Sequence, residues 1–298
     1  MEITKVFIAM KRGLLARLRT NGSYYILSGL LLLLAVPLYQ VFILGPTGFS
    51  AAQDSTSTGH YTAYIDWIGT HTLPFLIYRI LLIGAFCLLI SFPFSLHRII
   101  VAQELMAQQD QEAETQQEGK DTDLVPEHED NEKNEDEHED NDEDDGMPDH
   151  PWRGKGFVVL AAWSGLLGLV IYIIGAAITT AYFFLVGGSH GAAIYNSVAT
   201  LTPIFTIITN TVGTGLLGLG CLFFGGMIAR TGKNLWPNPW VAFGYASLFV
   251  GAILCISTVA VASAAGIGQS ALTTPATLLF AIWLLWLGIM LVRLKPEP

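Results

Sequence analysis

The chain has 298 residues, of which 52% are hydrophobic and only 13% are charged, and its formal net charge is −10. A soluble globular domain usually has about 25% charged residues, so this composition argues against a separate soluble catalytic domain. The three cysteines, Cys87, Cys221 and Cys255, all lie within apolar stretches and form no CxxC pair or Cys/His cluster. No disulfide framework or cysteine metal site is therefore expected.

Six apolar runs of about 18 residues or more predict six transmembrane helices, and hence an all-α, polytopic membrane helix bundle. The runs cover approximately residues 24–45, 73–96, 156–187, 200–229, 239–267 and 275–292. Pro37 and Pro93 fall inside the first two runs and are expected to kink them locally. Pro203 and Pro275 each follow a threonine, a pattern that predicts the starts of the fourth and sixth helices.

The first apolar run has to be distinguished from a cleaved signal peptide. Ser50, Ala51 and Ala52 follow it and resemble a small-residue cleavage site. The apolar stretch from Tyr24 to Leu44 has about 21 residues, however, whereas the apolar region of a signal peptide reaches about 15. We therefore expect an uncleaved first span.

Basic residues lie on one side of the predicted spans. Fourteen of the fifteen Lys and Arg residues fall in the two termini and in the segments that follow the second and fourth spans; they are Lys5, Lys11, Arg12, Arg17, Arg19, Arg98, Lys120, Lys133, Arg153, Lys155, Arg230, Lys233, Arg293 and Lys295. The segments 46–72, 188–199 and 268–274 contain neither Lys nor Arg. Because basic flanks remain on the cytoplasmic side, we expect both termini in the cytoplasm and a location in the inner or plasma membrane.

An acidic segment divides the chain. Residues 103–150 contain 21 of the 25 Asp and Glu residues and carry a net charge of −19, which leaves +9 for the rest of the protein. We expect three parts: residues 1–102 with the first two helices, an acidic disordered cytoplasmic loop over 103–152, and residues 153–298 with four helices. A solvated spacer is the preferred interpretation of the loop, and binding of cations or of a basic protein partner is the alternative.

Arg79 is the exception among the predicted spans, which otherwise contain no Asp, Glu, Lys or His. Charge inside a membrane is costly and usually functional, so Arg79 is the principal candidate for ligand binding. It follows Leu73 by six residues, which places it about 9 Å below the outer edge of the span. The alternative is that its side chain extends to the outer headgroups.

Polar residues of the outer half are the expected partners of Arg79. In the fourth run, Thr209 belongs to a polar stripe at helical spacing. We expect an outward-facing cavity for a small polar or anionic ligand, with the candidate ligand-binding residues Arg79, Asp66, Asn196, Thr202, Thr206 and Asn210. The competing interpretation is that the Thr and Asn side chains join helices, where each contributes about 0.6–2 kcal/mol.

Small residues predict the tightest helix contacts. One narrow stripe follows the fifth run, formed by Gly244, Ser247, Gly251, Cys255, Thr258, Ala262 and Ala265. The third and fourth runs are also rich in glycine, so spans three to five are expected to form the tight core. In the outer segment 55–72, apolar residues at helical spacing predict either a short interfacial helix or an extension of span two.

The C-terminal half resembles a large group of bacterial multipass membrane proteins that carry a domain of unknown function. The resemblance covers roughly residues 200–295 and rests on the glycine-rich stretch ending at Arg230, the turn at Pro237, the helix with Gly244 and Gly251, and the closing apolar stretch 282–289. It implies a bacterial inner-membrane protein. It transfers no activity, cofactor or catalytic residue.

Three functional hypotheses follow. The first is a non-enzymatic transporter-like or accessory membrane component with the outer polar pocket as its ligand site. The second is a regulatory or scaffold protein that recruits a basic partner through the acidic loop. The third, an enzyme acting on lipid, is the weakest, because the sequence offers no acid/base pair or metal cluster. We expect the lipid bilayer to be the partner of the protein. We expect no cofactor, no metal and no nucleic acid. Whether the chain forms a homo-oligomer is a question that the sequence leaves open.

Overall fold

The computed structural model describes residues 2–57, 61–103, 155–263 and 270–294. Within these ranges the chain is almost entirely helical and contains no β-strand. Nearly all of the acidic segment 103–150, with its expected disorder and its expected partners, lies outside the described residues. So does Ala265, the last member of the small-residue stripe in the fifth run.

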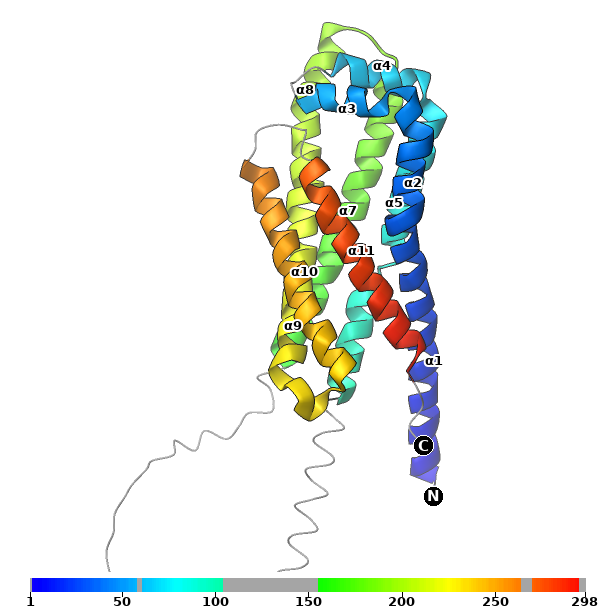
Figure 1. Cartoon of the computed structure of the whole chain (residues 1–298), viewed down its shortest axis with the longest axis vertical. Helices are drawn as coiled ribbons and strands as arrows, with labels where there is room; N and C mark the ends of the chain where they lie inside the picture. The colour runs from blue at the N-terminus through cyan, green and yellow to red at the C-terminus, as the bar shows by residue number, and fades with distance from the viewer. Residues whose placement is uncertain (1, 58–60, 104–154, 264–269, 295–298) are drawn as a thin grey trace, which may run out of the picture.

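The elements run from one end of the bundle to the other in alternation, with two short helices across one end (Figure 1). In chain order they are α1 (Glu2–Leu30), the π-helical η1 (Leu31–Ala35), α2 (Val36–Tyr39), the π-helical η2 (Gln40–Leu44), the 3₁₀-helical η3 (Gly45–Thr47), α3 (Phe49–Ser57), α4 (Thr62–Thr70), α5 (Thr72–Cys87), a helical stretch over 92–103, α7 (Lys155–Val186), α8 (Ala192–Thr206), the π-helical η4 (Ile207–Gly213), α9 (Thr214–Leu235), α10 (Asn238–Ser263) and α11 (Ser270–Val292).

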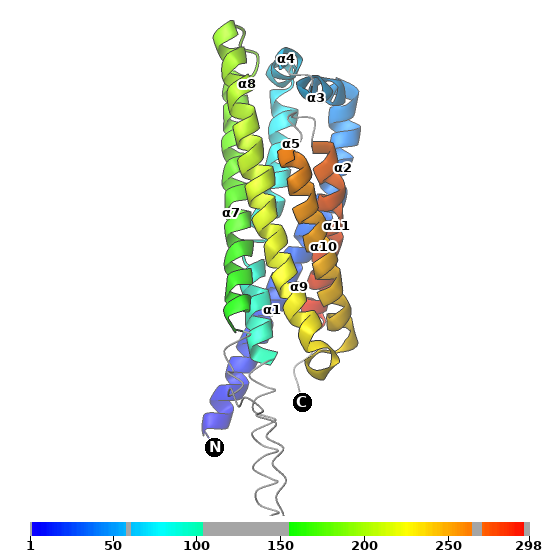
Figure 2. The same cartoon turned by 90° about the vertical axis from the view of Figure 1, so that its left-hand side faces the viewer.

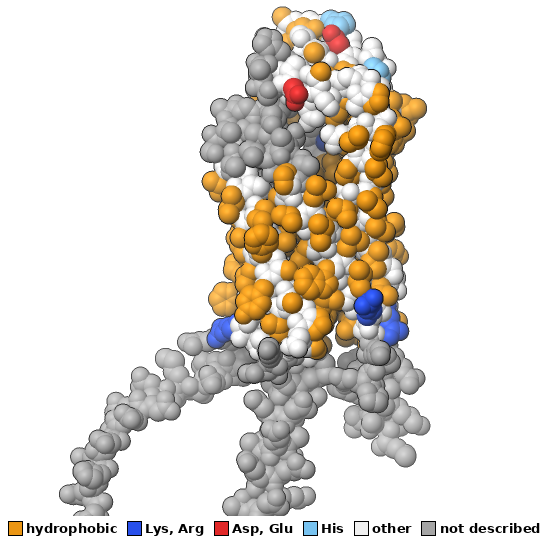
Figure 3. All heavy atoms as spheres, in the orientation of Figure 1, with side chains coloured by type: hydrophobic (Ala, Val, Ile, Leu, Met, Phe, Trp, Pro, Cys, Tyr) orange, Lys and Arg blue, Asp and Glu red, His pale blue; other side chains and the backbone are white. Residues whose placement is uncertain are grey.

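Within the described residues, six helices are long and apolar enough to cross a membrane: Gly13–Thr47, Thr72–Gln103, Gly156–Val186, Ala192–Gly232, Asn238–Val259 and Pro275–Val292. They run side by side (Figure 2), and apolar side chains are spread over the face of the bundle seen in Figure 3. An apolar surface of this kind is favourable in lipid and costly in water. Helices also satisfy their own backbone hydrogen bonds, as the lipid environment requires. The predicted all-α polytopic bundle is confirmed, and the chain is built as a multi-pass membrane protein.

Both termini lie at one end of the bundle, and α3 and α4 cross the other (Figure 1). We refer to these as the terminal end and the capped end. Most of the visible Lys and Arg side chains gather toward the terminal end, and the visible acidic and histidine side chains lie at the capped end (Figure 3). The charge separation read from the sequence is therefore also a separation in space.

The outer segment forms a separate helix rather than an extension of span two. The α4 helix ends at His71, whose φ of −124° and ψ of 38° interrupt the helical path before α5. Ile65 and Ile68 of α4 are fully buried against the bundle. Gly69 lies against Gly188 of the α7–α8 connection, and a Cβ at Gly69 would collide with the Gly188 backbone, so this position has no room for a side chain. The helix is therefore fixed to the protein as a cap.

Both predicted proline irregularities are present. Pro37 lies in the four-residue α2, between two π-helical segments. The second span leaves the helical path at residues 88–91, just before Pro93. Near this break, Ser28 of α1 donates a hydrogen bond to the carbonyl of Ala85 at 2.8 Å. Freed backbone groups in a membrane need such partners.

The starts of the fourth and sixth helices differ from the prediction. The fourth begins at Ala192, after Gly191 with its φ of 143°, and Pro203 lies inside it. The sixth begins at Ser270 and contains Pro275 in its interior. A proline is tolerated inside a membrane helix when neighbours satisfy the freed groups, so it does not by itself mark a first turn. Much of the expected outer loop 188–199 is consequently helical.

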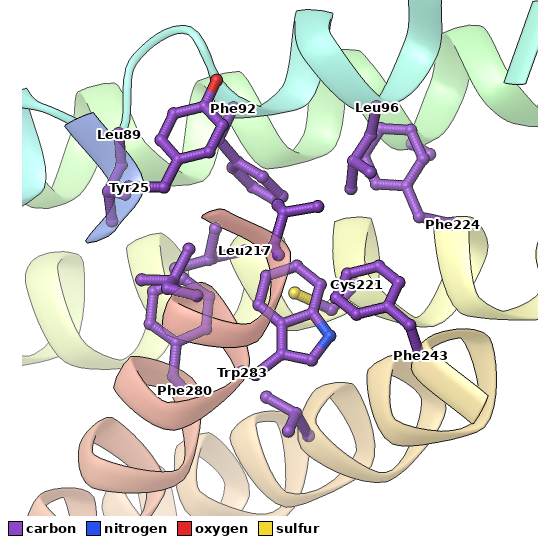
Figure 4. Packing of buried hydrophobic residues seen from close by; sticks show 14 of the residues in the cluster. Tyr25, Leu89, Phe92, Leu96, Leu217, Cys221, Phe224, Phe243, Phe280 and Trp283 are labelled. Atoms are coloured by element: carbon purple, nitrogen blue, oxygen red, sulfur yellow. The ribbon is translucent and has the colours of Figure 1, made fainter. Parts of the chain in front are cut away.

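One hydrophobic core draws on all six spans. Trp283 of α11 stacks between Phe243 and Phe280, with ring centroids 5.0 and 5.7 Å away, and Phe92 of span two meets it edge-on at 5.5 Å (Figure 4). The same cluster contains Tyr25 of α1. The two-span part and the four-span part on either side of the acidic segment therefore share a single core.

Glycines set the closest helix contacts. A Cβ at Gly251 of α10 would lie 2.8 Å from the carbonyl oxygen of Gly218 in α9, which agrees with the expectation for spans three to five. A second close pair was not expected: a Cβ at Gly22 of α1 would lie 2.9 Å from the carbonyl oxygen of Gly288 in α11. Backbones that approach this closely gain packing contacts that larger side chains would prevent.

Candidate functional site

A cavity of about 140 Å³ lies toward the capped end, between α5, α7, α8 and η4 and next to α3 and α4. Its lining combines hydroxyl, amide and aromatic side chains with one arginine: Gln53, Thr56, Tyr61, Tyr64, Arg79, Tyr172, Ala176, Thr179, Phe183, Thr202, Phe205, Thr206, Thr209 and Asn210. A partly apolar pocket with a few polar groups is the usual form of a small-molecule site.

Arg79 is held against α7. Its Nε donates to Thr180 Oγ1 at 2.8 Å, and its Nη2 donates to the backbone oxygen of Ala176 at 3.3 Å. Thr180 in turn donates to the same Ala176 oxygen at 2.6 Å. The guanidinium is therefore turned toward a neighbouring helix and oriented by it, instead of simply extending along lipid to the headgroups. Two of its five N–H donors are used in this anchorage.

The cavity is electropositive. Among the described residues that line it, Arg79 is the only charged one, and none is a carboxylate. Burial raises the pKa of Tyr64 to about 12, although the nearby Arg79 acts in the opposite direction. Burial also raises the pKa of Tyr61. Both hydroxyls therefore stay protonated and neutral at physiological pH, as hydrogen-bond donors beside a cation.

Three threonine hydroxyls, those of Thr202, Thr209 and Thr211, have no hydrogen-bond partner among the described residues, and the first two line the cavity. Thr202 and Thr209 are only 6% and 8% exposed, and their Oγ1 atoms bond to none of the described residues. Thr179 shows the ordinary alternative, because it donates to the carbonyl of Gly175 one turn earlier at 2.7 Å. An unsatisfied buried hydroxyl costs about 1–3 kcal/mol. Neither threonine joins two described helices by a hydrogen bond, which argues against the interpretation of this pair as helix-joining groups.

The π-helical segment η4 contributes to this geometry. It contains Thr209 and Asn210, and it follows α8 without a break. Gly175 of α7 faces it, and a Cβ there would collide with Thr209 Oγ1. Single π-helical turns occur often at functional sites because they redirect side chains locally. Here the segment turns a threonine and an amide toward the cavity.

The structure brings together four of the six candidate ligand-binding residues and separates two. Arg79, Thr202, Thr206 and Asn210 line the cavity, as does Thr209 of the same stripe. Asp66 and Asn196 are not among the described residues that line it.

Asp66 lies on the outer surface of α4, where its Oδ1 is 3.4 Å from Nδ1 of His190 and both side chains are at least half exposed. Asn196 is exposed and accepts a bond from Thr200 through its backbone oxygen. Each residue of a helix turns by about 100°, so Asp66 points away from the face that carries Tyr64, and Asn196 away from that of Thr202. Closeness in the sequence to residues of the cavity therefore did not place the side chains of Asp66 and Asn196 in its lining.

Sequence reasoning missed the contribution of α7. Tyr172, Ala176, Thr179 and Phe183 follow one another at helical spacing and form one wall of the cavity, and Thr180 anchors the arginine. A polar Thr179–Thr180 pair in an otherwise apolar run was the available signal. Among the described residues, no group of three or more His, Cys, Asp or Glu side chains is placed to hold a metal ion.

Comparison with known proteins finds no matching family model, no matching curated protein and no matching solved structure.

Proposed function

We propose that this protein binds a small polar or anionic solute in the cavity at Arg79 and acts as a transporter-like or accessory component of a bacterial inner membrane, and not as an enzyme. One observation carries the proposal: an anchored arginine shares a cavity with two buried threonines whose hydroxyls bond to no other described residue. A buried hydroxyl that faces a cavity without a protein partner is available to hydrogen-bond a ligand or water there.

The proposed orientation has both termini in the cytoplasm and the cavity toward the outside. Arg17, Arg19, Arg98, Arg230 and Arg293 all belong to segments predicted to be cytoplasmic. The segments that join the spans at the capped end lack Lys and Arg altogether. This asymmetry is the pattern that basic flanking residues give in bacterial membranes.

The experiment compares Arg79→Gln with Arg98→Gln in the purified full-length protein. Both substitutions remove one positive charge, but Arg98 is exposed and is not part of the cavity lining. Thermal unfolding is followed in detergent with a panel of small solutes: propionate, lactate, phosphate, sulfate, glycine and glycerol. A solute that binds only the folded state raises its stability by about 2.7 kcal/mol at a hundredfold excess over Kd.

We expect at least one solute to raise the melting temperature of the wild type and of Arg98→Gln, and not that of Arg79→Gln. Equal responses of all three proteins would contradict the proposal, as would a wild type that responds to none of the solutes.

A second candidate function rests on the charge of −19 carried by residues 103–150. In this alternative the segment recruits a basic protein partner or cations, and the membrane helices serve as its anchor. Deletion of residues 108–148 discriminates the two: solute binding should survive under the first proposal, and partner capture should be lost under the second. Chemical cross-linking of the full-length protein and of the deletion variant tests whether the chain forms a homo-oligomer.

A further inference from the structure

We infer that the solute is a short-chain monocarboxylate of about three or four carbons, bound with its carboxylate on Arg79 and its carbon chain against the aromatic wall of the cavity. The inference rests on the proposed ligand-binding function and names the chemical class of its ligand. Three properties of the cavity lead to it: the shape of the cation, the number of charges and the volume.

The shape of the cation favours a planar anion. A guanidinium presents its N–H groups in a flat fork that matches the two oxygens of a carboxylate. The bonds from Nε to Thr180 and from Nη2 to Ala176 hold one side of this fork on α7. The end that carries Nη1 and the second Nη2 hydrogen is the part suited to a carboxylate. Because α7 already fixes the plane of the group, little rotational freedom is lost on binding.

The number of charges favours a monoanion. Arg79 supplies one positive charge, and none of the other described residues of the lining supplies a second. A second negative charge on the ligand would be taken out of water without a partner, at a cost of several kcal/mol. The neutral hydroxyls of Tyr61 and Tyr64 add hydrogen bonds but no charge. Dianions such as sulfate and hydrogen phosphate are therefore disfavoured.

The volume limits the size of the ligand. A dry engineered protein cavity of about 150 Å³ holds one benzene molecule, which has six heavy atoms. The present cavity of about 140 Å³ therefore suits a ligand of five or six heavy atoms, the size of propionate or lactate. Phe183, Phe205 and the ring of Tyr172 offer apolar surface to a short carbon chain. The unpartnered hydroxyls of Thr202 and Thr209 supply partners for a carboxylate oxygen or for a ligand hydroxyl.

The test measures the melting temperature of the full-length protein in detergent at constant ionic strength. The probes are sodium propionate, sodium lactate, sodium phosphate, sodium sulfate and propionamide, which is the neutral counterpart of propionate with nearly the same shape. We expect propionate and lactate to raise the melting temperature by about 5 °C or more at a hundredfold excess over Kd, and the other three probes to leave it unchanged.

Variants locate the effect. Arg79→Gln should abolish the response to propionate, Arg79→Lys should weaken it because an ammonium lacks the flat fork, and Arg98→Gln should retain it. If Arg79→Gln fails to fold, the pH dependence of the wild-type response to propionate is the test instead. The increase in melting temperature that propionate causes should disappear as the pH falls below about 4–5, where the carboxylate of the ligand is protonated.

The remaining outcomes separate the two proposals. An Arg79-dependent response to phosphate or sulfate without one to propionate would overturn the monocarboxylate and leave the solute-binding function in place. Equal responses to propionate and propionamide would show that the anion is not recognised and would overturn the inference as well. If none of the probes, nor glycine or glycerol, gives an Arg79-dependent shift, both proposals fail.

Discussion

The two ends of the bundle differ in how some of their buried hydroxyl groups are paired. Toward the terminal end, aromatic rings and glycines close the space between helices, and buried polar groups are paired. Ser247, for example, is fully buried, accepts a bond from Nε1 of Trp283 at 2.8 Å and donates to the carbonyl of Phe243. Near the capped end, Thr202 is nearly as buried and its hydroxyl bonds to none of the described residues.

The difference teaches where to look for function in a membrane protein with few charges. A satisfied buried hydroxyl belongs to the packing, whereas an unsatisfied one beside a cavity and a cation is a cost that packing alone does not explain. The capped end is also closely packed, as at Phe49, Trp67 and Gly69, so the cavity is a local exception within a packed bundle. Five substitutions test this contrast, from the largest expected effect to the smallest.

Gly251→Leu should destabilise the protein most. Its Cβ would lie 2.8 Å from the Gly218 oxygen and from Leu222, so α9 and α10 have to separate. Overpacking usually costs about 1–3 kcal/mol, and a collision with backbone exceeds the lower value. The readout is the melting temperature in detergent. Gly226→Ala is the control, because its Cβ would meet only a side-chain atom at 4.0 Å. Equal melting temperatures for both variants would refute the packing of this end.

Ser247→Ala and Thr202→Val should shift stability in opposite directions. The first leaves the buried indole N–H of Trp283 without its partner and should lower stability by about 1–2 kcal/mol. The second removes an unpartnered hydroxyl at constant shape and should leave stability unchanged or raise it, while weakening the response to lactate. Melting curves with and without lactate report both quantities. A loss of stability in Thr202→Val comparable to that in Ser247→Ala would remove the contrast between the two ends.

Gly175→Ala should damage the cavity more than the fold. The added methyl group would collide with Thr209 Oγ1 and displace the π-helical segment η4. We expect a loss of stability of about 1 kcal/mol and at least a tenfold weaker binding of propionate. Gly84→Ala in α5 is the matched control, because nothing lies within 4 Å of its Cβ. Binding that is unaffected in Gly175→Ala would place Thr209 outside the ligand site.

Arg19→Gln should have the smallest effect. The guanidinium of Arg19 donates from Nε and Nη2 to the carbonyl of Leu294, at 3.1 and 2.5 Å, and so caps the end of α11. An exposed interaction of this kind contributes about 0.3–1 kcal/mol, and salt screens it. The difference in melting temperature from the wild type should shrink as the salt concentration rises. A salt-independent difference would indicate a packing role for the side chain in place of an electrostatic one.

The sequence predicted part of the candidate site because a helix has a regular period. Thr202, Thr206 and Asn210 recur on one face at that period, and they do lie together. Arg79 was identified by its isolation in apolar sequence. Asp66 and Asn196 were grouped with them by nearness along the chain alone, and helix rotation turns them away from the cavity. The wall supplied by α7 was missed, because its residues are individually ordinary in a membrane span.

The sequence by itself determined the number of spans, the helical class and the separation of charge. Lipid offers no hydrogen bonds, so a long apolar run has to form a helix whatever its neighbours are. Only the tertiary structure decided which helices meet: the pairing of Gly22 with Gly288, the anchorage of Arg79 on Thr180 and the unpartnered state of Thr202 and Thr209. These features depend on the rotation and approach of helices far apart in the chain, and a periodicity within one helix carries no information about its neighbour.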